Sequence, residues 1–107
     1  MKLYISMPMN GKTPQQITRD RNIAFAKAVS ALGIACEAAG YSCGPVEVID
    51  QIHPNANKVT SLECLGYSIA KMSEADVVYF AEGWEQARGC RIEHECACAY
   101  GKQVITA

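Results

Sequence analysis

The chain has 107 residues and a mass of 11.6 kDa, which is the size of one small domain. Half of its residues are hydrophobic and 20% are charged, a composition that excludes a disordered chain. Its net charge of −1 lacks the basic excess of a nucleic-acid-binding protein, and we expect neither a membrane span nor a signal peptide. We therefore predict one cytoplasmic domain over residues 1–107.

The first part of the chain predicts a strand, a loop and a long helix. Residues 2–6 are a β-type run, and the loop over residues 6–13 contains Pro and Gly. The helix begins with Thr13 as its cap and Pro14 in its first turn, and it ends at Gly40. Its apolar positions recur at helical spacing: Ile17, Ala24, Phe25, Ala28, Leu32, Ala35, Cys36 and Ala39.

The middle of the chain predicts a second strand and a shorter helix. Residues 45–50 are rich in Val and Ile, and the polar loop over residues 53–57 follows them. The helix begins after Thr60 or Ser61 as its cap. Its apolar positions are Leu62, Leu65, Ile69 and Met72.

The last third predicts a buried strand, a helix and a final strand. Residues 76–81 are a nearly continuous apolar run, typical of a central strand covered on both faces. A polar loop over residues 82–88 leads into a helix over residues 89–100, which Gly101 ends. Residues 103–106 form the last strand.

This alternation of strands and helices predicts the fold class. We expect a small doubly wound α/β sandwich, flavodoxin-like or Rossmann-like, with a four- to five-stranded parallel sheet. Ligands of such folds bind at the carboxyl ends of the strands. Here those ends are the loops over residues 6–13 and 82–89.

The six cysteines do not indicate disulfides, because nothing suggests secretion and most of them lie in apolar segments. They are Cys36, Cys43, Cys64, Cys90, Cys96 and Cys98. Cys90, His94 and Cys98 are spaced by four, so they would share one stripe of a helix and could offer three metal ligands. Such a stripe arises more often by chance from reduced thiols, and we expect no metal.

The loop over residues 6–13 also matches most of the phosphate-binding pattern G-x-x-x-x-G-K-[ST]. Ser6 replaces the first Gly, and Pro8 interrupts the backbone amides that would cradle a phosphate. A P-loop NTPase, with Lys12 on the phosphates, is therefore a less favoured alternative.

The helix over residues 89–100 carries the strongest candidate for chemistry. At 100° per residue, its apolar side is centred on Gly89, Ile92, Cys96, Ala99 and Tyr100. Glu93 lies within about 60° of that centre, whereas Arg91, His94 and Glu95 point outward. A carboxylate in this position can act as a nucleophile, because the helix N-terminus favours its ionised form. The alternative is that Glu93 only complements the helix dipole.

Three segments resemble a family of unknown function found in bacteria and phages: residues 4–11 (YISMPMNG), 75–80 (ADVVYF) and 83–95 (GWEQARGCRIEHE). That family is related to the nucleoside 2-deoxyribosyltransferases. Their superfamily has a small doubly wound fold, forms dimers or larger oligomers, and cleaves N-glycosidic bonds through a glutamate nucleophile. By resemblance, Glu93 matches the nucleophile, Tyr4 the tyrosine that hydrogen-bonds it, and Asp76 the aspartate at the start of the central strand.

The resemblance implies a nucleoside or nucleotide N-glycosidase or 2-deoxyribosyltransferase. Glu93 would attack the anomeric carbon and Asp76 would assist the leaving base, with no cofactor. The expected binding residues are Ser6, Asn10, Gly11, Arg88 and Gly89 for sugar or phosphate oxygens, and Trp84 for the base. The expected partners are a nucleoside or nucleotide and further copies of the chain, in a homodimer or larger homo-oligomer.

The chain departs from the superfamily at two points. The transferases have a further acid before the nucleophile helix, for which only Glu82 or Glu85 is available here. They also complete each site with a neighbour's residue beyond the last strand, where this chain stops at Ala107. A nucleotide-binding or sensing protein without catalysis, on the same fold, is therefore the alternative function.

Overall fold

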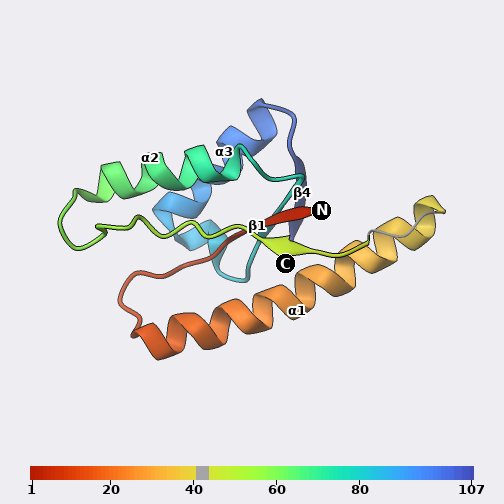
Figure 1. Ribbon diagram of the computed structural model, residues 1–107, viewed down its shortest axis with the longest axis horizontal. Coiled ribbons are helices and arrows are strands. Elements are labelled where there is room, and N and C mark those ends of the chain that lie inside the picture. Colours follow the sequence, from red (N-terminus) through yellow and green to blue (C-terminus); the bar gives the residue numbers. More distant parts are fainter. Residues whose placement is uncertain (41–43) are drawn as a thin grey trace.

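The computed structural model describes residues 1–40 and 44–107. Four parallel strands form one sheet in the order β2-β1-β3-β4. The strands are β1 (Lys2–Ser6), β2 (Glu47–Val48), β3 (Val77–Phe80) and β4 (Gln103–Thr106). Helix α1 (Pro14–Ala39) covers one face of the sheet, and α2 (Ser61–Met72) and α3 (Arg88–Ala99) cover the other (Figure 1). The predicted small doubly wound α/β fold is confirmed, with four strands.

The two central strands, β1 and β3, form the middle of the core. They pair in register from Leu3 opposite Val77 to Ser6 opposite Phe80. Alternate residues of a strand point to opposite faces, so one set faces α1 and the other faces α2 and α3. The set on the α1 side is Leu3, Ile5, Val77 and Tyr79, and the set on the other side includes Tyr4, Val78 and Phe80.

Helix α1 begins and ends where its sequence predicts. The Thr13 hydroxyl accepts a hydrogen bond from the Gln16 backbone N–H, and the Gln16 side chain accepts one from the Thr13 N–H, which completes a capping box. Gly40 ends the helix with a left-handed φ of 85°. Its fully buried residues are Ala24, Ala28, Leu32 and Cys36. Ala35 and Ala39 are exposed, because a four-stranded sheet covers only one narrow stripe of the helix.

Helix α1 is also long and apolar enough to cross a membrane, which the sequence reading did not anticipate. Core helices of soluble proteins have the same length and composition. Here Ala24, Ala28 and Leu32 pack on the sheet, and 22% of the apolar window is buried.

Several predicted elements differ in extent. Strand β2 has two residues instead of the expected six over residues 45–50. A short 3-10 helix, η1 (Trp84–Gln86), lies within the predicted loop over residues 82–88. Thr60 caps α2, but Leu62, an expected core residue, is 76% exposed. The buried residue of α2 is Met72, in its last turn, which packs against the sheet.

The predicted orientation of α3 is wrong in its details. Its buried residues are Cys90, Glu93 and Ala97, whereas the expected core residues Ile92 and Tyr100 are exposed. The large side chains of this layer, Tyr4 and Phe80, come from the strands. Small residues of α3 therefore face the sheet, and the helix is turned so that Glu93 lies in the middle of its buried side.

Candidate functional site

The site is built around the Glu93 carboxylate, which lies in the second turn of α3 and is only 6% exposed. The Tyr4 hydroxyl donates a hydrogen bond to Oε2 of Glu93. The Ser6 hydroxyl donates one to Oε1 over 3.0 Å. Tyr4 and Ser6 lie two residues apart on β1, so both point to the α3 side, and both are fully buried.

Burial and hydrogen bonding have opposite effects on the pKa of the Glu93 carboxyl group. Burial raises the pKa of Glu93, and the hydrogen bonds from Tyr4 and Ser6 lower it in part. Burial and the nearby charge of Glu93 raise the pKa of the Tyr4 phenol above its ordinary value. Tyr4 therefore stays protonated at neutral pH and remains a hydrogen-bond donor to the carboxylate.

Glu93 lies in the wall of a cleft of about 680 Å³, referred to below as the Glu93 cleft. The loop after β1, one side of α2, and the start of α3 form its walls. Of the predicted site residues, Asn10, Arg88 and Gly89 line this cleft together with Glu93. Ser6 lies behind them and reaches the site through its hydrogen bond to Glu93. The structure therefore brings six predicted residues together, counting Tyr4.

Two of the predicted binding residues lie outside the cleft lining. Gly11 is exposed in the loop after β1. Trp84 is half-buried and stacks on His94, with 4.3 Å between ring centroids, and it also contacts Phe80. Trp84 therefore packs against the end of the sheet instead of facing the Glu93 cleft.

The structure does not bring Asp76 to the site. Its carboxylate accepts a hydrogen bond from the Lys2 backbone N–H over 2.7 Å, at the amino ends of β1 and β3. Glu93 bonds to Ser6 at the carboxyl end of β1. A strand of four residues spans about 13 Å, so Asp76 lies at the opposite end of the sheet from Ser6. The expected role of Asp76 at the leaving base does not fit this position.

Neither candidate for the additional acid lines the Glu93 cleft. The Glu82 carboxylate is 89% exposed and lies 4.0 Å from the Lys27 ammonium, on the α1 side of the sheet. Glu85 is exposed in η1, where its backbone carbonyl accepts a hydrogen bond from the Arg91 guanidinium. Within the described lining, Glu93 is the one carboxylate.

Helix α2 also contributes to the cleft, which was not predicted from the sequence. The α2 residues that line it are Ser61, Cys64, Leu65 and Ser68. Spacings of three and four place them on one helical face, which was the available signal. A hydrogen bond with Ser68 also lowers the pKa of Tyr4 in part, so α2 touches the same network.

The predicted Cys90, His94 and Cys98 stripe does not converge on one point. Cys90 is buried in the cleft wall, where burial raises the pKa of its thiol. His94 stacks on Trp84 and lies 3.9 Å from the exposed Cys98 Sγ. Among residues 1–40 and 44–107, no three His, Cys, Asp or Glu side chains are arranged to hold a metal ion. Cys43 lies outside the described residues.

The side chains that a P-loop would use are engaged elsewhere. The Lys12 ammonium pairs with the Asp20 carboxylate at 2.7 Å. The Thr13 hydroxyl caps α1 by accepting the Gln16 N–H. Neither side chain lines the Glu93 cleft.

Comparison with known proteins assigns the chain to a family. A family model described as "Domain of unknown function (DUF4406)" matches residues 1–106. The chain belongs to the DUF4406 family. No curated protein and no solved structure matches it. The DUF4406 match extends from β1 to β4, so it includes Tyr4, Ser6 and Glu93.

Proposed function

We propose that the protein is an N-glycosidase or 2-deoxyribosyltransferase that acts on nucleosides or nucleotides, with Glu93 as its nucleophile. The observation that carries this proposal is the buried Glu93 carboxylate, held by the Tyr4 and Ser6 hydroxyls in the wall of the Glu93 cleft. The cleft volume of about 680 Å³ suits a ligand of nucleoside size.

The reaction would follow the two-step logic of retaining glycosidases. A Glu93 oxygen forms an ester bond with the anomeric carbon while the C–N bond to the base breaks, and the bonding electrons leave with the base nitrogen. Water, or the nitrogen of a second base, then attacks the same carbon, the ester C–O bond breaks to release the Glu93 carboxylate, and the attacking group loses its proton to solvent. Tyr4 and Ser6 orient the carboxylate in both steps.

The leaving base would take its proton from water, because the described cleft lining holds no carboxyl group besides Glu93. This favours substrates whose base is a good leaving group without a strong general acid. It also removes Asp76 from the mechanism that the resemblance implied.

The start of α3 provides the expected anchor for an anionic substrate group. Ala87, Arg88 and Gly89 all line the cleft, and no side chain caps the helix at Ala87. Backbone N–H groups of an uncapped helix start attract anions, and the Arg88 guanidinium adds a positive charge. A 5′-phosphate at this position would place the sugar toward Glu93.

The direct test is to incubate the purified protein with deoxynucleosides and their 5′-monophosphates and to measure free base by chromatography. We expect base release from at least one member of the panel, and none with Glu93→Gln. Glu95→Gln is the matched control, because Glu95 is exposed on the same helix. Equal base release by wild type and Glu93→Gln would refute the proposal.

The second candidate is a nucleotide-binding or sensing protein without catalysis. The absence of a second carboxylate from the described cleft lining favours it. Calorimetric binding of a nucleotide without any base release would support this alternative. A magnesium-dependent ATP isotherm that Lys12→Ala abolishes would instead support the P-loop hypothesis, but the Lys12–Asp20 pair makes us expect none.

We also propose that the protein acts in the cytoplasm as a homodimer or larger homo-oligomer. Two exposed apolar side chains, Ile92 in α3 and Tyr100 at its C-cap, support a contact between copies there. The resemblance points the same way, because that superfamily builds its sites near subunit contacts.

A further inference from the structure

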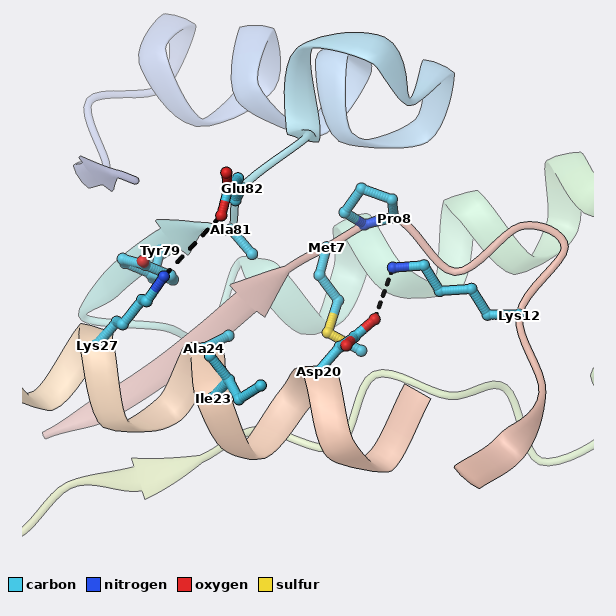
Figure 2. A pocket seen from close by; sticks show the side chains of 10 residues that line it. All are labelled: Met7, Pro8, Lys12, Asp20, Ile23, Ala24, Lys27, Tyr79, Ala81 and Glu82. Atoms are coloured by element: carbon cyan, nitrogen blue, oxygen red, sulfur yellow. Dashed lines mark hydrogen bonds and ion pairs between the residues drawn. The ribbon is translucent and has the colours of Figure 1, made fainter. Parts of the chain in front are cut away.

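A second pocket, the α1 pocket, lies at the carboxyl ends of β1 and β3 on the opposite side of the sheet from Glu93 (Figure 2). Its volume is about 290 Å³. Met7 and Pro8 line both this pocket and the Glu93 cleft, so this short segment separates the two. The remaining walls come from α1 and from the residues at the end of β3.

The α1 pocket exists because small residues face each other where α1 passes the strand ends. Ala24 on α1 and Ala81 after β3 both line it, and both are buried. Neither side chain extends beyond Cβ, so the space between helix and sheet stays open. The pocket therefore has an apolar floor, to which Met7 also contributes.

Tyr79 contributes a hydrogen-bond donor to this pocket. Its side chain is 3% exposed and lines the pocket. Burial and the charge of Glu82 raise the pKa of Tyr79, so the phenol stays protonated at neutral pH. A protonated phenol in a pocket wall can donate a hydrogen bond to a ligand bound there.

Lys27 provides a positive charge that forms only a weak ion pair with Glu82. Its ammonium lies 4.0 Å from the Glu82 carboxylate, and the two side chains are 57% and 89% exposed. Such a pair contributes little stability, so a ligand can replace Glu82 at small cost. The Lys12–Asp20 pair at the other end is tighter, at 2.7 Å, and lowers the pKa of Asp20. Figure 2 shows the two ion pairs at opposite ends of the pocket, with Tyr79 beside the loose one.

We propose that the α1 pocket is a second ligand site, which binds a small organic anion. Its charged group, a carboxylate or a phosphate monoester, accepts a hydrogen bond from the Tyr79 hydroxyl and pairs with the Lys27 ammonium. Its apolar body lies against Ala24 and Met7. This site is separate from the Glu93 cleft, and it stands whether or not Glu93 is catalytic.

The test is a titration of ¹⁵N-labelled protein followed by NMR, with benzoate, phenyl phosphate and benzamide as probes. Benzoate and phenyl phosphate should shift the amide signals of Ala24, Lys27 and Glu82, and the tighter of the two identifies the preferred anion. Uncharged benzamide, which has nearly the shape of benzoate, should shift them much less. Absence of binding by both anions would refute the site, as would equal shifts from benzamide.

Four variants locate the anion within the pocket. Tyr79→Phe and Lys27→Gln should each weaken binding of the tighter probe about tenfold, because each removes one contact to a charged group. Glu82→Gln should tighten it about twofold, because Lys27 loses its competing partner. Tyr100→Phe is the matched control for the lost hydroxyl, since Tyr100 is 86% exposed at the C-cap of α3.

Two further variants separate this site from the Glu93 cleft. Lys58→Gln, at an exposed position in the loop before α2, should leave binding unchanged. Glu93→Gln should also leave it unchanged, because Glu93 does not line the α1 pocket. Unchanged affinity in Tyr79→Phe, or shifts centred on Gly89 and Glu93, would place the anion elsewhere and overturn the proposal.

Discussion

The two faces of β1 carry opposite kinds of side chain, although all four residues concerned are at most 1% exposed. Leu3 and Ile5 face α1 and are entirely apolar. Tyr4 and Ser6 face α3, and each presents a hydroxyl that donates to Glu93. One strand thus builds core on one side and a polar site on the other.

The two faces differ in what burial contributes to stability. Burying Leu3 and Ile5 stabilises the fold directly, by about 2 kcal/mol for each side chain. Burying a carboxylate with two hydroxyls is costly, and the hydrogen bonds offset this cost only in part. A fold of this size is marginally stable, so a buried charged group at this position points to a role beyond packing.

The largest effect on the rate of base release should come from Glu93, which accepts both hydroxyl hydrogen bonds. Glu93→Gln should lower the rate of base release at least about 10³-fold, because the amide is nearly isosteric with the carboxylate but is not a nucleophile. Glu95→Gln should stay close to wild type. Chromatographic rates for the two variants under identical conditions provide the check, and reversed results would exclude Glu93 as the nucleophile.

A paired substitution on β1 should separate the two faces. Leu3→Ala should cost about 3 kcal/mol in the free energy of unfolding, because it leaves a cavity, while the folded fraction keeps its rate. Ser6→Ala should cost about 1 kcal/mol and lower the rate about 10- to 100-fold, because Glu93 loses a fixed donor. Urea unfolding and base release measured on both variants would test this crossed pattern. If Leu3→Ala lost rate as Ser6→Ala does, the contrast between the faces would fail.

The pH dependence should report Glu93 directly. Burial raises the pKa of Glu93, so base release should fall, as pH decreases, at a higher pH than an ordinary glutamate would give. Tyr4→Phe removes a hydrogen bond that lowers this pKa, so it should move the fall to still higher pH. Ile5→Val, on the apolar face, should not move it. Profiles of kcat/KM against pH would show this ordering, and a shift to lower pH in Tyr4→Phe would contradict it.

The free energy of unfolding should also depend on the ionisation of Glu93, but it should decrease with rising pH where base release increases. The pKa of Glu93 is raised in the folded state, so its stabilising contribution is present at low pH and declines as pH rises above the unfolded value. Glu93→Gln should therefore be about 1 kcal/mol more stable than wild type at neutral pH, with a smaller difference in acid. Urea unfolding at two pH values measures it, with Glu95→Gln as the control. A large loss of stability in Glu93→Gln at neutral pH would argue for a structural role.

The smallest expected effect concerns the oligomeric state, which changes the mass in solution by a factor of about two. Light scattering should give at least twice 11.6 kDa, because Ile92 in α3 and Tyr100 at its C-cap are exposed. Tyr100→Lys should favour the monomer. Leu62→Lys, at a 76% exposed position on α2, should not. A wild-type mass of 11.6 kDa at high micromolar concentration would refute the oligomer.

Local signals in the sequence were sufficient for much of the fold. The caps at Thr13 and Gly40 and the apolar run that became β3 depend on neighbouring residues, so they could be recognised directly. Glu93 could be chosen from its place in the helix, even though the expected helix orientation was wrong. That error arose because the largest apolar side chains were assumed to face inward, whereas Ile92 and Tyr100 face solvent.

The rest depended on contacts between distant segments. The place of Asp76 at the amino end of the sheet follows from its position at the start of the predicted strand over residues 76–81, but its hydrogen bond with Lys2, 74 residues away, is encoded by no local pattern. The wall that Ser61 and Ser68 add to the Glu93 cleft requires the packing of α2 beside α3. The α1 pocket likewise depends on Ala24 meeting the end of β3 across the core.

The length of α1 has a consequence for how the molecule fluctuates. Its 26 residues span about 39 Å, and its later turns extend past the sheet (Figure 1). Over residues 34–39 every residue except Cys36 is exposed, so few side-chain contacts oppose a local opening of these last turns. Their amide hydrogens should exchange with deuterated solvent well before those of β1 and β3. The end of α1 should thus fray and re-form many times while the strands that hold Tyr4 and Ser6 stay closed.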